Sequence, residues 1–321
     1  MNRGLHRFAL VVAGATFFLI IAGALVTSHD AGLATADWPL TEGRFLPKVE
    51  ALGIRSGVNM VGNLFWEHGH RMVATTVGLL TIGLVIFLAL KEKRRWVRRL
   101  GWLALGTVIA QGLLGGLTVK LMLPLVVSAA HATLAQLFFC ITVSLAVFTS
   151  RSWMADRGVI AGIDGQGSLS VRYLCVAAAA TIFVQLIIGA TLRHSATWDK
   201  PLPTDLLLTH IAGALAVTIL LAGAAILILR RHAGETFLTR PAKLALSLLG
   251  LQLLLGIAAF VTRTASPNDP QPLNPMIAIT VAHVACGALV FATTIVLTLR
   301  SFKVLRGAEV AIGGRSLEFN V

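Results

Sequence analysis

Four histidines recur at matching places along this sequence. His70, His131, His210 and His283 each lie about one turn into a long apolar segment. An ionisable side chain inside a membrane-length segment is costly, and such residues mark functional sites more often than packing positions. One such histidine is equally well explained by a hydrogen bond to a neighbouring helix. Four at a similar depth, in equivalent positions, favour ligands of a bound group.

The neighbouring residue types favour haem as that group. Zinc and copper sites usually add cysteines or carboxylates to histidines, and Glu67 is the only carboxylate close to these histidines. Two histidines facing each other across a helical bundle can hold six-coordinate haem, and no CxxCH motif predicts covalent attachment. Small residues beside the histidines leave room for a flat macrocycle, although they also simply allow helices to pack closely. They are Ala132, Gly213, Ala285 and Gly287.

Charged residues at the same end of the segments are the next candidates. Glu67 lies three residues before His70, so the two side chains share a helix face. The carboxylate is either a solvated helix start or a group that handles protons or charge beside the haem. Arg71, Arg193 and Arg263 lie where haem propionates would emerge, but basic helix ends are also common. The other five histidines are expected to be solvated; they are His6, His29, His68, His194 and His232.

The segments that carry these residues predict a membrane protein. The chain of 321 residues is 56% hydrophobic and 13% charged, with a mean hydropathy of +0.82. It contains eight apolar segments of roughly 20 residues, the length a helix needs to cross a bilayer. They are residues 8–27, 67–90, 97–119, 127–149, 171–192, 206–229, 242–262 and 277–299.

Charge placement predicts the orientation. Most of the 27 basic residues lie before the first segment, after the last, or in the loops around 91–99 and 230–243. The positive-inside rule therefore places both termini in the cytoplasm and the histidines toward the extracytoplasmic face of the cell membrane. The net charge of +13 follows this pattern and forms no basic stripe with aromatics, which argues against nucleic acid as a partner.

An internal repeat divides the chain into halves. A Gln-x-x-x-Gly pattern precedes three of the histidines, as Gln111–Gly115, Gln185–Gly189 and Gln252–Gly256; Gly23 precedes His70 more loosely. We expect an all-α protein of two pseudo-symmetric four-helix bundles, 1–150 with a long outer loop at 28–66, and 171–300. A cytoplasmic linker (151–170) and a cytoplasmic tail (301–321) complete it. Repeated helix pairs also occur in transporters, so the repeat alone does not define a function.

This constellation resembles the haem A synthase family, membrane enzymes that convert haem O to haem A for terminal oxidases. The resemblance covers nearly the whole chain. It rests on GALVTSHDAGLATADWP (23–39), WEHGHRMVATTVGLL (66–80) and the segments around the other three histidines. The Glu-x-x-His-Arg element and the loop's Gly-Leu…Asp-Trp-Pro are its specific parts.

The resemblance implies a role for each half. His70 and His131 would bind the haem being modified, with Glu67 beside the reacting C8 methyl group, which successive hydroxylations turn into a formyl group. His210 and His283 would bind a permanent haem b. We expect haem O to come from a haem O synthase, lipid to surround the chain, and an electron-transfer partner of unspecified kind; a homo-oligomer is compatible with this scheme.

The sequence departs from the family at two points. Some members carry a cysteine pair around the Asp-Trp-Pro element, where this chain has Thr35 and Thr41, so other contacts must hold the loop. Ser28, His29 and Asp30 stand where a basic residue often precedes the Gly-Leu pair. The main alternative is a di-haem electron carrier that modifies nothing. It accounts for the four histidines but assigns no role to Glu67.

Overall fold

The computed structural model describes residues 2–35, 37–41, 43, 62–155, 160–161, 165–196, 202–265 and 272–306. The regular secondary structure of this part of the chain is helical except for one short parallel pairing of β1 (Ile160–Ala161) with β2 (Leu305–Arg306). Eight of its helices are long and apolar enough to cross a membrane, which confirms the predicted number of spans. They are α1 (Arg3–Ser28), α2 (Asn63–Lys91), α3 (Arg95–Lys120), α4 (Leu125–Thr149), α6 (Gly165–Ser195), α7 (Thr204–Arg231), α8 (Thr236–Thr264) and α9 (Asn274–Val304).

Every predicted apolar segment lies inside one of these helices, and each helix is longer than its segment. Polar residues cap the extensions: the side chain of Asn2 accepts a hydrogen bond from the amide of Leu5, and that of Glu235 accepts one from Phe237. A four-residue helix, α5 (Arg151–Met154), begins the predicted linker. The loop segment 44–61, the linker residues 156–159 and 162–164, and the tail from 307 lie outside the described residues.

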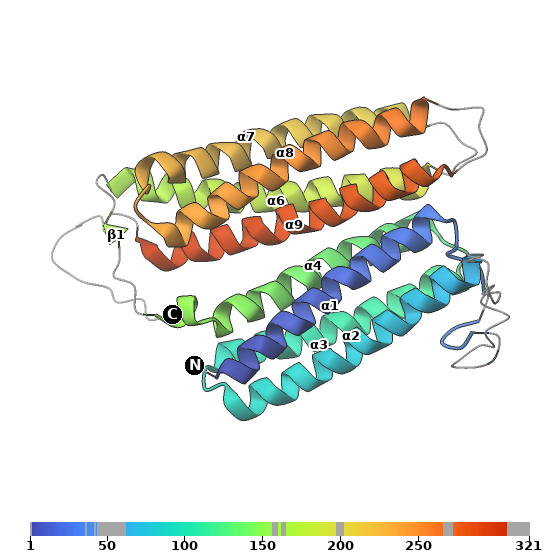
Figure 1. The fold of residues 1–321 in the computed structure, drawn as a ribbon, viewed down its shortest axis with the longest axis horizontal. Helices are drawn as coiled ribbons and strands as arrows, with labels where there is room; N and C mark the ends of the chain where they lie inside the picture. Colours follow the sequence, from blue (N-terminus) through green and yellow to red (C-terminus); the bar gives the residue numbers. More distant parts are fainter. Residues whose placement is uncertain are drawn as a thin grey trace.

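The helices form two groups, α1–α4 and α6–α9, which lie side by side in Figure 1. Consecutive helices pack as antiparallel pairs, α1 with α2, α3 with α4, α6 with α7 and α8 with α9. The groups meet through α4 and α9, with α1 and α6 on either side. In α4 and α9, 61% and 56% of the most apolar window is buried, against 11–33% in the other six helices. These two histidine-bearing helices therefore form the centre of the molecule.

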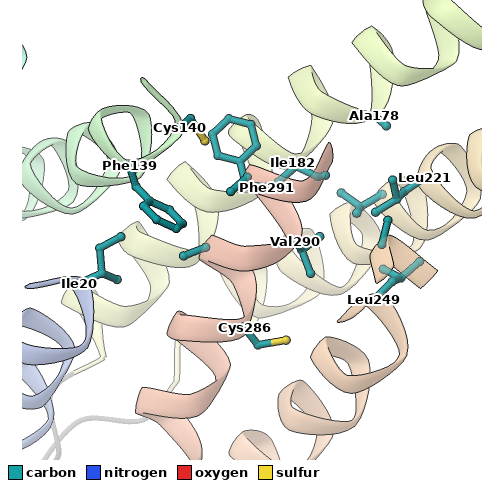
Figure 2. Packing of buried hydrophobic residues seen from close by; sticks show 14 residues of the cluster. Ile20, Phe139, Cys140, Ala178, Ile182, Leu221, Leu249, Cys286, Val290 and Phe291 are labelled. Atoms are coloured by element: carbon teal, nitrogen blue, oxygen red, sulfur yellow. The ribbon is translucent and has the colours of Figure 1, made fainter. Parts of the chain in front are cut away.

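The largest apolar cluster spans the boundary between the groups. Ile20 of α1 and Phe139 of α4 lie across from Phe291 of α9, and the cluster continues to Leu249 of α8 (Figure 2). Each group also has a cluster of its own that extends to the end opposite the histidines, one including Leu88 and the other including Leu238. Both groups are thus held to one another by close packing, so their histidines are fixed within a single framework.

Candidate histidine-pair sites

Each of the four candidate histidines packs against a glycine of the helix that precedes it. Because the glycine has no side chain, the imidazole can approach the helix backbone closely; a Cβ there would lie only 3.0–3.2 Å from the ring Cε1. The contacts are His70 on Gly23, His131 on Gly115, His210 on Gly189 and His283 on Gly256. The glycine in each repeat therefore sets where the ring lies, and this holds for the loosely matching first pair as well.

The helices bring the histidines together in the predicted pairs. In the α6–α9 group, the ring centroids of His210 and His283 are 6.4 Å apart with an angle of 69° between the planes. Two imidazoles bound to one metal through nitrogens at about 2 Å have centroids about 6 Å apart, so this separation fits a shared metal. In the α1–α4 group, His70 and His131 are close enough to interact electrostatically.

Glutamines of the repeat hold three of these histidines. The Nε2 group of Gln111 donates to the carbonyl oxygen of His131 (2.9 Å), and that of Gln185 donates to the carbonyl oxygen of His210 (2.8 Å). The same nitrogen of Gln185 lies 3.0 Å from Nδ1 of His210.

In the last pair, Nε2 of Gln252 lies 3.3 Å from Nε2 of His283. The small residues Gly213 and Gly287 face Gln185 and Gln252, so each glycine makes space for a glutamine. The open space expected beside those two glycines is thus filled by side chains of this chain.

Six of the eleven buried side-chain atoms without a hydrogen-bond partner among the described residues belong to these histidines and glutamines, and they point to a ligand of both sites. Nδ1 of His70, His131 and His283 is buried without a hydrogen-bond partner, and so is Oε1 of each of the three glutamines. Buried polar atoms normally have partners, so such a cluster marks a place where another group binds. In the described part of the chain no three His, Cys, Asp or Glu side chains come together as a metal-binding group. The residues therefore fit a haem held between two histidines.

Glu67 distinguishes the site of the α1–α4 group. Its carboxylate is almost completely buried, with 3% of the residue exposed. Oε1 lies 2.5 Å from Nη2 of Arg71, and Oε2 accepts a hydrogen bond from the amide of Thr35 (3.0 Å). The solvated helix start considered for Glu67 is therefore wrong: the carboxylate is part of an internal network between α2 and the first loop.

Arg71, also on α2, forms hydrogen bonds with the first loop. Its Nη1 group donates to the carbonyl oxygens of Asp37 (2.9 Å) and Leu40 (2.7 Å). The same nitrogen reaches the hydroxyl of Thr41 (3.3 Å), which also lies 3.1 Å from Nδ1 of His68. His68 is buried, so the expectation that it is solvated was wrong. Thr35 and Thr41, which replace the cysteine pair of some relatives, thus both take part in holding the loop.

The loop also covers the helix that supports His131. The indole of Trp38 lies on Gly116 of α3, where a Cβ would come within 2.6 Å of a ring carbon. Gly116 is next to Gly115, and the imidazole of His131 packs against Gly115. Two adjacent glycines therefore accommodate two rings, one from the loop and one from the site. The sequence contains the glycine pair, but nothing in it indicates which ring each glycine would meet.

Arg193 and Arg263 come together at the matching end of the α6–α9 group. Arg193 interacts electrostatically with Arg263 and with Asp30, and its Nη2 donates to the hydroxyl of Ser28 (3.1 Å). His194 also interacts electrostatically with Arg193 and with His131. The end of α1 and Asp30 just after it therefore interact with α6, and the two arginines lie near each other as a haem carboxylate pair would require. Arg71 lies apart from them, in the loop network.

A cavity of about 490 Å³ lies at the opposite end of the helices from the histidines. Phe139 of α4, Pro241 of α8 and Arg300 of α9 line it, and none of the four candidate histidines does. The histidine sites therefore do not coincide with this cavity.

These observations define a class: a multi-span membrane protein with two candidate sites, each built from a pair of histidines at the same end of the helices. Residues 6–198 match the family of cytochrome oxidase assembly proteins termed COX15-CtaA, which is more than half of the chain. The chain belongs to this family, in which the haem A synthases fall. His210 and His283 lie beyond the matched residues.

Individual relatives carry the name heme A synthase. The chain is 41% identical to the protein from Beijerinckia indica subsp. indica over 120 residues, 36% of this chain and 33% of that one. It is 35% identical to the protein from a Methylobacterium species over 162 residues (49% and 43%). It is 27% identical to the one from Lysinibacillus sphaericus over 199 residues (60% and 59%). The chain thus aligns with about a third to three fifths of the length of these relatives.

Proposed function

We propose that this protein is a haem A synthase that converts haem O to haem A for the assembly of haem A-containing terminal oxidases. The observation that carries the proposal is a difference between the two histidine-pair sites. In both sites the imidazoles pack against glycines, but only the pair of His70 and His131 has a buried carboxylate, Glu67, on the helix of one of its histidines. A protein that only carried electrons through two haems would not need Glu67. Family membership supports the same conclusion.

In this proposal, His70 and His131 bind the substrate haem O, and His210 and His283 bind a haem b. Haem b, when bound, supplies one-electron redox chemistry. Two successive hydroxylations of the C8 methyl group followed by loss of water produce the formyl group of haem A. Glu67 places a negative charge beside the reacting carbon, while Arg71 and the amide of Thr35 hold that carboxylate in place. Arg193 and Arg263 pair with propionates of the haem b.

The remaining assignments complete the proposal. Both termini lie in the cytoplasm, and the histidine sites face the extracytoplasmic side of the cell membrane, as the basic loops favour. Residues 1–150 form the substrate half and 171–300 the haem b half, related by approximate symmetry, with the linker 151–170 and the tail 301–321 in the cytoplasm. A haem O synthase delivers the substrate. An electron-transfer partner exchanges the electrons that the oxidation requires, and identical chains are free to associate in the lipid.

The test is to produce the protein in cells that make haem O but lack their own haem A synthase, and to extract and separate the haems. We expect haem A from the unmodified protein and from His232→Ala, a histidine at the other end of the helices. We expect no haem A from His70→Ala or Glu67→Gln. Cells that contain only haem b and haem O with the unmodified protein would refute the enzyme and leave the di-haem electron carrier.

A further inference from the structure

Three of the four candidate histidines are anchored by a glutamine, and one is not. Gln111 and Gln185 each connect two helices by donating to the backbone carbonyl of the histidine opposite, and Gln185 and Gln252 lie within 3.3 Å of a ring nitrogen. The position equivalent to these glutamines in the first repeat, four residues before Gly23, is Leu19.

Apolar residues replace the whole arrangement beside His70. Leu19 is partly buried and packs against the apolar cluster of the α1–α4 group, and so does Val73, one turn after His70. In the α6–α7 pair the corresponding positions hold Gln185 and Gly213, which face each other. His70 therefore sits on its glycine as the others do, but no side-chain amide reaches it in the described part of the chain.

An imidazole that gives one nitrogen to iron carries a proton on the other. An acceptor for that N–H fixes the ring orientation and makes the imidazole a stronger ligand. Gln252 has an unpartnered Oε1 and lies against the ring of His283, so a rotation of its amide offers such an acceptor. Gln111 and Gln185 instead restrain His131 and His210 by holding the backbone carbonyl of each histidine. Leu19 offers neither kind of contact. The four ligands are thus unequal, and the weakest one is in the half that contains Glu67.

We propose that Gln111, Gln185 and Gln252 are positioning residues for His131, His210 and His283, and that Leu19 leaves His70 as the exchangeable ligand of the substrate haem. This inference rests on the proposed function, because it takes haem as the bound group. The exchangeable position would then be the one that His70 holds, on the helix that also carries Glu67. The site of the α6–α9 group stays closed because both of its ligands are anchored.

The experiment uses the full chain, purified with its haems from cells that make haem O, reduced, and exposed to carbon monoxide as the probe of an open iron position. We expect one haem per chain to bind carbon monoxide in the unmodified protein. Leu19→Gln should slow that reaction by about tenfold, the size of effect that second ligand-shell groups have. Gln252→Leu should make the second haem reactive as well.

Gln136→Leu is the matched control, since Gln136 is buried on α4 but, in the described structure, forms no hydrogen bond with a histidine. It should leave the carbon monoxide reaction unchanged. Visible spectra and haem content identify variants that still hold both haems. If Leu19→Gln with both haems reacts as fast as the unmodified protein, or if Gln252→Leu stays unreactive, the inference is wrong. If haem A still forms when the inference is contradicted in this way, the proposed function remains. If the purified chain contains no haem in either half, both the inference and the proposed function are wrong.

Discussion

Arg71 connects helix and loop through a single guanidinium. Its two Nη groups serve a carboxylate of α2 on one side and two loop carbonyls and a hydroxyl on the other. A guanidinium is planar and presents several donors in a fixed fork, which an ammonium group cannot reproduce. Arg71 was predicted as a propionate contact; in the structure its Nη groups instead donate hydrogen bonds to Glu67 and to residues of the first loop. A propionate-binding role for it stays a prediction.

We therefore expect Arg71→Lys to loosen the loop although the positive charge remains. The ammonium group can stay near Glu67 but cannot reach both carbonyl oxygens, so unfolding should become easier by about 1–3 kcal/mol. Thermal unfolding in detergent measures this change. Arg230→Lys, an exposed arginine at the other end of the helices, is the control and should have no effect. Equal unfolding temperatures for the two variants would contradict the role given to Arg71.

The histidines could be predicted from the sequence, whereas the residues that position them could not. A histidine inside an apolar segment is visible without any structure, because its polarity contradicts its surroundings. The glutamines and glycines of the repeat were visible as a pattern, but their contact with the histidines depends on how neighbouring helices rotate against each other. Burial of Glu67 and His68 also depends on where residues about 30 positions away fold back, which local sequence does not determine.

At the scale of elements, the first loop and α3 act together. Trp38 rests on Gly116, and the loop is held on its other side by α2. We expect Gly116→Ala to displace the indole, because its Cβ would overlap the ring. Gly112→Ala on the same helix should have no such effect, because nothing lies within 4 Å of the added atom.

Hydrogen exchange of the backbone amides of Asp37, Trp38, Leu40 and Thr41 measures this displacement. Faster exchange in Gly116→Ala alone is the expected result. Similar exchange in both variants would mean that the loop is held without Trp38.

The turn between α2 and α3 contains a second ion pair, at the opposite end of the helices. Glu92 and Arg94 form two side-chain hydrogen bonds, of 2.9 and 2.8 Å, and Arg94 also donates to the carbonyl oxygen of Phe148 on α4. The hydrogen bonds from Arg94 lower the pKa of Glu92 below its ordinary value of 4.5. The turn thus joins three helices through one charged pair.

Glu92→Gln should therefore lower the unfolding temperature at neutral pH but not in acid. A carboxyl whose folded pKa is depressed stabilises the fold above its unfolded pKa, near 4.5, and loses that contribution as the pH falls through the folded value. The difference between variant and unmodified protein should be present at pH 7 and absent once Glu92 is protonated in both states. A difference that persists below that range would mean that the pair is not responsible.

The membrane-spanning helices could be predicted from the sequence, because the length and polarity of a segment define a span. The arrangement of the helices was less accessible. The two most buried helices, α4 and α9, have mean hydropathies of only 1.9 and 2.0 in their most apolar windows, below five of the other six. A helix surrounded by other helices does not contact lipid and tolerates more Ser, Thr and small residues, so apolarity does not identify the centre of a bundle.

At the scale of the whole molecule, the orientation in the membrane is open to direct measurement. Basic residues gather around the α2–α3 and α7–α8 turns and at both ends of the chain, so these parts should face the cytoplasm. A fluorescent protein fused to the C-terminus should fluoresce. Alkaline phosphatase inserted after Met122, in the α3–α4 turn, should be active because it is exported. Active phosphatase at the C-terminus instead would reverse the proposed orientation.

The placement of the glycine contacts has a consequence for assembly. Each imidazole meets its glycine within one helical hairpin, α1–α2, α3–α4, α6–α7 or α8–α9, so each hairpin can form this contact as it enters the bilayer. A histidine pair, in contrast, exists only when two hairpins have docked. A ligand that requires both histidines binds the docked state alone and favours it by mass action. Under the proposed function, haem would therefore join two hairpins that have already formed in each half. The supply of haem would then control the fraction of chains in which the hairpins have docked.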